Sequence, residues 1–352
     1  MTGATDPPDP IRLGVLHDFP QPDGGKYFES GLRLGLETRE ERLDREIELI
    51  TRHERGLPGG TAHAVQRGFR ELAVEGCLAV IGPSISDNGI LIRDLADRER
   101  IPCINYTGGA ITRSKWMFHY QVGSLEEEPA VLARHLRERG LTTVAVAHDD
   151  TPVGDNYRDW LLLAAATAGI DVVGQAAVSP MAEDVTEPVR RLISSQPQAL
   201  CYLGLGVAAR AVALAVQSLG WEGPVVANSA LMFGYGRPDW REGWEGWSYC
   251  DLIGDDNRER QYLSQRSRAL AGGPIGVAAY DIGRLLGEGL VRAANLSRPG
   301  LQEGLERVKR LPAAGGAAGT LMGFGAWDHA ALKGEFLVLR SWRDGRSVEM
   351  TS

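Results

Sequence analysis

The sequence has no long apolar run and no excess of positive charge. None of its apolar stretches reaches the roughly 18–20 residues that a membrane-spanning helix needs, so we expect no direct insertion into a membrane. Acidic side chains outnumber basic ones by 46 to 38, which gives a formal net charge of −8 at pH 7. Because a protein that grips phosphates needs a concentrated basic face, the sequence predicts no nucleic-acid partner.

A recognisable secretory signal is also missing. Residues 1–10 are polar and rich in proline, and strand-like sequence begins at Ile11, whereas a signal needs an apolar run of about 7–15 residues. We therefore expect residues 1–10 to form a disordered tail. The protein is expected in the cytoplasm if this N-terminus is native, and in the periplasm if the N-terminus was trimmed.

Motifs of metal binding and catalysis are absent as well. The four cysteines form no C-x-x-C pair and lie far apart, at Cys77, Cys103, Cys201 and Cys250, which is typical of buried, reduced thiols. Two His-Asp pairs, at 17–18 and 148–149, follow strand-like runs, where adjacent side chains point to opposite faces. No third ligand lies at a suitable spacing, and no pair of residues stands out as acid and base. The sequence predicts no metal, no cofactor and no catalytic residue.

What the sequence does contain is an alternation of short apolar runs with amphipathic stretches. Strands are predicted at residues 11–16, 47–51, 78–81, 102–105, 143–148, 171–174, 199–203, 224–228 and 335–342. Helices are predicted at residues 27–42, 61–74, 88–100, 129–139, 157–168, 185–194, 208–219, 259–270, 277–294 and 299–310. Strand, helix, strand at this spacing indicates right-handed βαβ units around buried parallel sheets.

Four local motifs occur in an order that is typical of one family. They are Ala79–Pro83 followed by Ser84-Ile85-Ser86, Arg100-Ile101-Pro102 leading to Asn105–Gly109, His148-Asp149-Asp150 with Gly154, and Ala278-Ala279-Tyr280-Asp281. From about Ile11 to the final strand, the chain resembles the leucine/isoleucine/valine-binding family of ABC-transporter substrate-binding proteins. The resemblance implies an α/β fold of the type I periplasmic-binding-protein kind, with two Rossmann-like lobes, parallel sheets and three crossing strands.

The same resemblance implies the division of the chain. Lobe 1 would comprise residues 11–121 and 255–322, and lobe 2 residues 122–254 and 323–352, with crossings near 121–124, 250–254 and 321–324. In this arrangement the carboxyl ends of both sheets face one cleft, where open parallel sheets generally bind ligands.

Small polar residues and aromatics follow the strands that would end at this cleft. The predicted ligand-binding residues are Phe19, Ser86, Tyr106, Thr107, Gly108, Gly109, Asp149, Asn228, Ser229 and Tyr280. In the family, the loops that match Ser86, Thr107 and Gly109 commonly hold a ligand carboxylate. The alternative is that Ser86 and Asp87 only cap a helix starting at Asn88, and that the aromatic residues pack within the lobes.

The second lobe departs from the amino-acid binders of the family. An acid that pairs with the ligand's ammonium is replaced by Asn228-Ser229, and an aromatic that covers the ligand is replaced by Val153. A buried ammonium without a partner costs several kcal/mol. A free α-amino acid is therefore disfavoured, unless Asp149 or Asp18 supplies the charge, and a carboxylate, amide or neutral aromatic ligand fits better.

We expect a non-catalytic protein that closes by hinge motion on a small molecule and serves an ABC permease or, as a cytoplasmic sensor, a regulatory protein. The alternative is an NAD(P)-dependent enzyme using the Gly204–Ala209 turn, which reads G-x-G-x-x-A. Against it, the next strand ends at Asn228-Ser229 without the acid that a dinucleotide site requires. A binding fold that serves only as an interaction scaffold is a third possibility.

Overall fold

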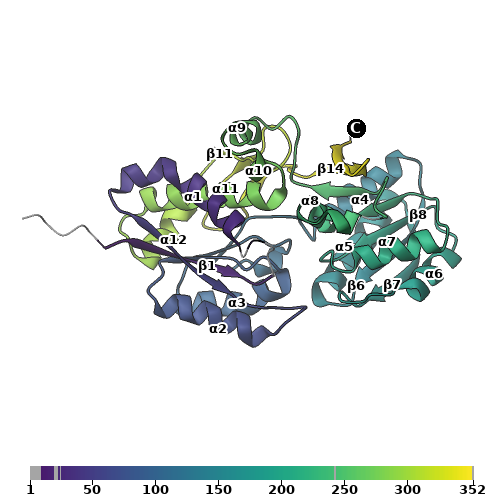
Figure 1. Ribbon diagram of the computed structural model, residues 1–352, viewed down its shortest axis with the longest axis horizontal. Helices are drawn as coiled ribbons and strands as arrows, with labels where there is room; N and C mark the ends of the chain where they lie inside the picture. Colours follow the sequence, from purple (N-terminus) through teal and green to yellow (C-terminus); the bar gives the residue numbers. More distant parts are fainter. Residues whose placement is uncertain (1–8, 20–22, 24, 242, 351–352) are drawn as a thin grey trace, which may run out of the picture.

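The structure is a computed structural model, and it describes residues 9–19, 23, 25–241 and 243–350. The tail expected at residues 1–10 therefore lies almost entirely outside the described residues. Figure 1 shows two α/β lobes joined by several extended connections. In the described part of the chain, no helix is both long and apolar enough to cross a membrane.

The first lobe is built on a parallel sheet in the order β2-β1-β3-β4-β5. Its strands are β1 (Ile11–His17), β2 (Ile47–His53), β3 (Ala79–Ile81), β4 (Cys103–Asn105) and β5 (Met117–His119). One face packs on α1 (Lys26–Leu43), α11 (Pro274–Arg292) and α12 (Arg298–Glu306). The other face packs on α2 (Ala62–Val74) and α3 (Ser86–Glu99).

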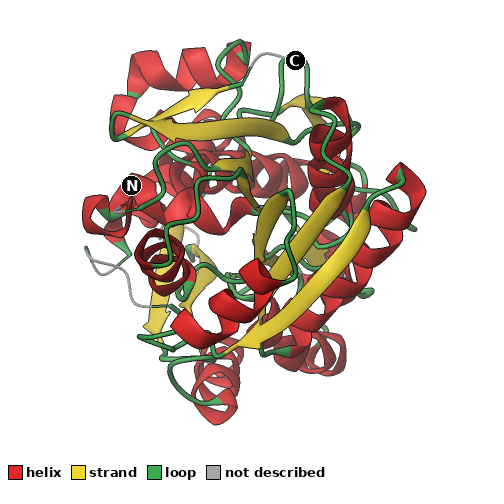
Figure 2. Ribbon diagram, turned by 90° about the vertical axis from the view of Figure 1, so that its right-hand side faces the viewer, coloured by secondary structure: helices red, strands yellow, loops and turns green. Residues whose placement is uncertain are grey.

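The second lobe has a mixed sheet in the order β15-β14-β10-β9-β8-β6-β7. Its parallel strands are β6 (Thr143–Asp149), β7 (Asp171–Val178), β8 (Ala199–Leu203), β9 (Val225–Ala227) and β10 (Ser248–Asp251). Two antiparallel strands, β14 (Val338–Arg343) and β15 (Arg346–Glu349), extend one edge. Figure 2, which looks onto this lobe, shows the sheet between its helices. These are α4 (Glu127–Glu138), α5 (Pro152–Ala168), α6 (Thr186–Ser194) and α7 (Ala209–Ser218).

Short elements connect these layers. Around the second sheet lie η2 (Ser229–Met232), α8 (Phe233–Gly236) and η3 (Pro238–Arg241). In the first lobe lie η1 (Ala110–Thr112), α9 (Arg258–Arg266), α10 (Arg268–Ala271) and a small sheet of β11 (Leu311–Pro312), β12 (Leu321–Met322) and β13 (Leu332–Lys333). The predicted element order is confirmed, including the final strand, which is β14. The strands β5, β10 and β15 and the small sheet β11-β12-β13 are additions.

Helix α2 shows how the sequence pattern produces these elements. Thr61 precedes the helix, and its side chain accepts a hydrogen bond from the backbone N–H of Ala64 at 3.2 Å. Val65, Phe69 and Leu72 recur at helical spacing and are completely buried against the sheet. Burying each such side chain stabilises the fold by roughly 1.5–3 kcal/mol, so the apolar face determines where the helix lies.

The third crossing between the lobes lies further along the chain than the sequence indicates. The first two crossings fall near the expected positions, because Val122 and Leu252 pack in the first lobe while Leu125 and Cys250 pack in the second. Residues 323–336, expected in lobe 2, remain in lobe 1. Phe324, Leu332 and Phe336 belong to the core of the first lobe, and the Phe324 ring lies 4.9 Å from that of Phe118. The chain therefore crosses after Phe336.

A buried carboxylate on α11 holds two of these connecting segments together. Asp281 is 0% exposed, and it accepts hydrogen bonds from the Tyr120 hydroxyl at 2.9 Å and from the backbone N–H groups of Ala314 and Gly315 at 2.8 and 3.0 Å. Burial raises the pKa of Asp281, while the nearby Arg284 opposes this shift. The carboxylate thus joins α11 to the end of β5 and to the segment before β12.

Replacing Asp281 tests this role. Asp281→Ala leaves one buried hydroxyl and two buried N–H groups without an acceptor, so we expect a loss of about 3 kcal/mol or more in the free energy of unfolding, measured by urea denaturation. The matched control is Asp239→Ala on η3, an exposed carboxylate, which should change stability by less than about 0.5 kcal/mol. Equal effects of the two substitutions would contradict the assignment.

Candidate ligand-binding site

The loops at the carboxyl ends of both sheets enclose a pocket between the lobes, here called the inner pocket. It encloses about 610 Å³, including space open to solvent. The first lobe contributes Pro58, Ser84, Ile85, Ser86, Asp87, Tyr106, Thr107 and Gly108. The second lobe contributes Asp149, Thr151, Val153, Tyr157, Pro180, Gly204, Leu205, Asn228, Ser229, Ala230 and Met232, and the connecting residues Val122 and Leu125 complete the lining.

A larger and more apolar space adjoins the inner pocket and is here called the outer chamber. Its volume is about 1450 Å³, again including open solvent. Both lobes line it, with Phe19, Asp23, Tyr27, Arg268 and the start of α11 on one side, and Phe233, Tyr235 and Arg237 on the other. The two spaces share Ser84, Ile85, Tyr106, Leu205 and Met232. The two spaces therefore adjoin each other in the cleft between the lobes.

The structure brings most of the predicted ligand-binding residues to this cleft. Ser86, Tyr106, Thr107, Gly108, Asp149, Asn228 and Ser229 line the inner pocket, and Phe19 lines the outer chamber. Gly109 and Tyr280 are not among the lining residues. Helix α11 begins at Pro274, so Tyr280 lies about two turns inside it, and its hydroxyl donates to Glu259 at 3.3 Å.

The alternative interpretation, that Ser86 and Asp87 only cap a helix starting at Asn88, is wrong. Helix α3 already begins at Ser86 and has no side-chain cap of its own. The Ser86 hydroxyl instead accepts a hydrogen bond from the backbone N–H of Gly108 at 3.2 Å. This bond joins the loop after β3 to the loop after β4, and it leaves the hydroxyl proton of Ser86 free to point into the pocket.

Asp18 supplies the acceptors that the start of α3 needs. Its carboxylate, only 1% exposed, accepts from the backbone N–H and the hydroxyl of Ser84 at 2.8 and 2.7 Å, and from the backbone N–H of Ile85 at 3.1 Å. It also accepts from the side-chain amide of Asn88 at 2.8 Å. Asp18 is bonded to all of these donors and lines neither space. It is therefore a structural anchor, and not the partner for a ligand ammonium that the sequence analysis had kept as a possibility.

Thr107 is held by a buried polar cluster beneath its loop. Its hydroxyl donates to the side-chain carbonyl of Asn105 at 2.8 Å, and Thr112 donates to the same oxygen at 3.2 Å. The His119 ring lies 2.7 Å from the Thr107 carbonyl oxygen, and burial lowers the pKa of His119 to about 3. The hydroxyl proton of Thr107 is therefore directed away from the cleft, and the cluster fixes the loop.

Two carboxylates face the inner pocket, one from each lobe. Asp149 accepts from the Tyr202 hydroxyl at 2.8 Å and from the backbone N–H of Leu205 at 2.7 Å. Burial raises its pKa to about 6, and the charge of Asp87 contributes to this shift. Burial likewise raises the pKa of Asp87 to about 6, and its Oδ1 is buried with no hydrogen-bond partner among the described residues. Of the described residues that line the inner pocket, none is Lys, Arg or His.

Asp87 is the functional candidate that the sequence analysis missed. Its position just before the helix predicted from Asn88 is typical of a capping residue, and this explanation needed no ligand. The signal that could have found it is its position after Ser86, on the loop that resembles the family's first ligand loop.

The Gly204–Ala209 turn is arranged differently from a dinucleotide site. A Cβ atom on Gly204 would lie 2.4 Å from Asp149 Oδ1, so the carboxylate fills the space beside this glycine. The backbone N–H of Leu205 is already bonded to that carboxylate. An incoming pyrophosphate would meet a negative charge in place of free N–H donors, which disfavours NAD(P) at this turn.

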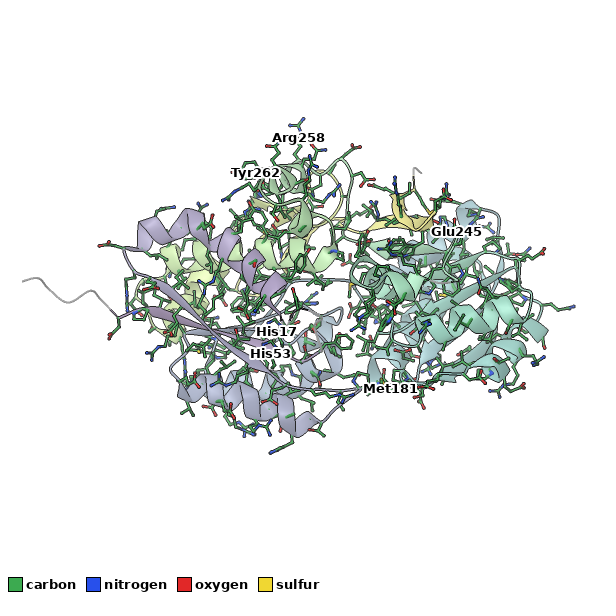
Figure 3. All side chains as sticks on the ribbon, viewed as in Figure 1. His17, His53, Met181, Glu245, Arg258 and Tyr262 are labelled. Carbon is green, nitrogen blue, oxygen red and sulfur yellow. The ribbon has the colours of Figure 1, made fainter. Side chains whose placement is uncertain are left out.

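The histidines near the strand ends pack against neighbouring rings. The His17 ring stacks on that of His53 with centroids 4.9 Å apart, and its edge meets Phe28 at 5.7 Å; Figure 3 shows the two labelled histidines close together in the first lobe. Burial lowers the pKa of His17 to about 4. In the described ranges, no group of three or more His, Cys, Asp or Glu side chains could hold a metal ion, and all four cysteines are buried and free.

Two α/β lobes with a cleft at their strand ends define the two-lobed class of ligand-binding proteins. The Periplasmic binding protein family model matches residues 10–334. The chain belongs to this family, whose members bind substrates and are not enzymes, and this confirms the fold and the resemblance found in the sequence.

Solved structures agree with this fold. An extracellular ligand-binding receptor from Rhodopseudomonas palustris HaA2 superposes with a TM-score of 0.83 at 17% identity, covering 97% of this chain and 100% of the other. A type 1 periplasmic binding protein from Bordetella pertussis Tohama I superposes with a TM-score of 0.82 at 16% identity and with the same coverage. An ABC transporter substrate-binding protein from Desulfitobacterium hafniense, in complex with Leu, gives 0.79 at 19% identity, again covering 97% and 100%. No curated protein matches the chain.

The raised pKa of Asp149 makes stability depend on pH. Because the folded state binds this proton more tightly than the unfolded state, the contribution of Asp149 to stability is present below about pH 4 and is lost as the pH rises through about 6. Asp149→Asn should remove this pH dependence. Between pH 4 and 7, the free energy of unfolding of the wild type should therefore fall by about 2–3 kcal/mol more than that of the variant. Urea denaturation at several pH values measures the difference.

The control for this experiment is Asp150→Asn, which changes the exposed neighbouring carboxylate. Its stability should follow the wild-type curve across the same pH range. Parallel curves for the wild type and Asp149→Asn would show that burial does not raise the pKa of Asp149.

Proposed function

We propose that this protein captures a small molecule in the cleft by closing its two lobes, and that it does not alter the ligand chemically. The observation that carries the proposal is the composition of the inner pocket. Loops after β3 and β4 of the first lobe meet loops after β6, β8 and β9 of the second, so that one ligand contacts both lobes. Contact with both lobes favours the closed arrangement, and this difference in affinity drives the closure.

Contacts between the lobes are consistent with a closed form. The rings of Phe19 and Phe233, one from each lobe, lie 5.4 Å apart in the outer chamber. Gly108 of the first lobe has room for no larger side chain, since a Cβ atom there would lie 2.9 Å from the Leu125 side chain and 3.3 Å from the Tyr157 hydroxyl. Closure thus brings the two walls of the inner pocket into direct contact around the ligand.

The polar groups of the inner pocket favour a ligand that donates hydrogen bonds. Asp87 and Asp149 offer carboxylate oxygens, and the hydroxyl of Ser86 and the side chain of Ser229 lie beside them. Val153 stands in the place of the aromatic that the family's amino-acid binders use, so the pocket wall is aliphatic at this position. We infer that ligand specificity depends on these side chains together with the aromatic residues of the outer chamber.

We favour a role in which the protein delivers the captured ligand to an ABC-type permease outside the cytoplasm. The support is the similarity to ABC transporter substrate-binding proteins and the membership of the family. The second candidate is a sensor that reports closure to a regulatory protein. Delivery to a permease and sensing would use the same capture step.

A thermal-shift screen of carboxylates, amides and aromatic compounds tests the capture step. A ligand at roughly a hundred times its Kd should stabilise the folded protein by about 2.7 kcal/mol and raise its Tm. Leu205→Trp places a large ring where the inner pocket and the outer chamber meet. This variant should lose the ligand-induced shift while its unliganded Tm stays near that of the wild type.

Leu214→Trp is the matched control, because Leu214 is an exposed leucine on α7 that lines neither space. It should keep the full ligand-induced shift. If no compound in the screen stabilises the wild type, the capture function is refuted, and this result supports the hypothesis that the protein serves only as an interaction scaffold. If Leu205→Trp responds to the ligand as the wild type does, the ligand binds elsewhere.

A further inference from the structure

The two parts of the cleft carry opposite charges. The inner pocket has Asp87 and Asp149, whereas the outer chamber has Arg237 from the second lobe and Arg268 from the first. The remaining charged residue of the chamber lining is Asp23. Its carboxylate is occupied at the start of α1, where it accepts from the backbone N–H groups of Gly25 and Tyr27 at 3.0 and 2.8 Å. Asp23 keeps its negative charge in these bonds, so the chamber lining carries two positive charges and one negative charge.

The two arginines are available to bind a ligand, because no acidic side chain of the described residues pairs with them. Within the described part of the chain, neither Arg237 nor Arg268 has a carboxylate partner. The Arg237 guanidinium lies over the Trp240 ring, 4.7 Å from its centroid, and this stacking holds its planar donor face in one orientation. Each lobe contributes one arginine, so an anion between them would also hold the lobes together.

The walls next to these arginines suit a flat apolar group. The Phe233 ring lies 5.3 Å from that of Trp240 and 5.4 Å from that of Phe19. Tyr27, Met232 and Ile275 complete this part of the lining. Aromatic rings pack favourably on one another in offset or tilted arrangements at such distances, so the chamber matches an aromatic ring.

A carboxylate has poor partners in the inner pocket. Three of the backbone N–H groups in its lining are already engaged, since that of Ile85 bonds to Asp18, that of Gly108 to Ser86, and that of Leu205 to Asp149. Asp87 and Asp149 would in addition repel it. The anionic end of a ligand is therefore favoured in the outer chamber, and a hydrogen-bond donor is favoured in the inner pocket.

We propose that the ligand is an elongated aromatic carboxylate that lies across both spaces. Its carboxylate pairs with Arg237 and Arg268, its ring packs against Phe19 and Phe233, and a donor group at its far end meets Asp87 and Asp149. This orientation places the carboxylate away from Ser86, Thr107 and Gly109, where the resemblance to the family would place it. The proposal rests on the capture function and names the ligand class for the same cleft.

Matched probes test this orientation. The probes are 3-(4-hydroxyphenyl)propanoate, its uncharged amide, and 3-phenylpropanoate, which lacks the donor. By isothermal titration calorimetry the wild type should bind the hydroxylated acid about tenfold or more tightly than either of the other probes, as charge-assisted hydrogen bonds predict. Arg237→Gln combined with Arg268→Gln should abolish the preference for the acid over the amide.

The matched control is Arg258→Gln, which removes an arginine at the outer edge of the molecule on α9 (Figure 3) that lines neither the inner pocket nor the outer chamber. It should keep the wild-type preference for the acid. The proposal is overturned if the wild type binds acid and amide equally, if the double variant keeps the preference, or if none of the probes binds. If none of them binds while another compound in the thermal-shift screen does, the ligand class fails and the capture function stands.

Discussion

A buried aspartate at the end of the first strand of each lobe organises the cleft. Asp18 follows β1 and binds the loop after β3, and Asp149 ends β6 and binds the loop after β8. In each lobe the carboxylate thus accepts backbone N–H groups from the loop of another strand. Because these loops form part of the walls of the inner pocket, the positions of the ligand-facing groups on the loops after β3 and β8 depend on these hydrogen bonds.

The two buried aspartates, Asp18 and Asp149, differ in whether their carboxylates can contact a ligand. Asp18 lines neither space and is bonded to Ser84, Ile85 and Asn88, so its burial serves the fold alone. Asp149 lines the inner pocket and faces Asp87 across it. Bringing two like charges into a pocket is costly without a partner. In the capture function proposed above, a hydrogen-bond donor on the ligand would offset this cost when the lobes close, so the same two acids would give closure its specificity.

The sequence was sufficient for the order of the elements and for most of the cleft, because both follow from local signals: apolar periodicity, and polar residues directly after strands. It failed where the outcome depends on contacts between distant segments. The position of the third crossing depends on Phe324 and Phe336 packing in the first lobe, which no local pattern distinguishes. Tyr280 was misplaced because α11 begins earlier, at Pro274. Asp87 and the two arginines of the outer chamber became visible only when the lobes were placed together.

The central claim is that a ligand closes the two lobes, and a distance measured between them tests it directly. Nitroxide labels at Val74→Cys on α2 and Leu163→Cys on α5 would sit on exposed positions of different lobes, while the native cysteines are buried. By pulsed electron paramagnetic resonance, we expect ligand to convert a broad distribution of distances into a single narrower one that matches the closed form. The same distribution with and without saturating ligand would contradict the account.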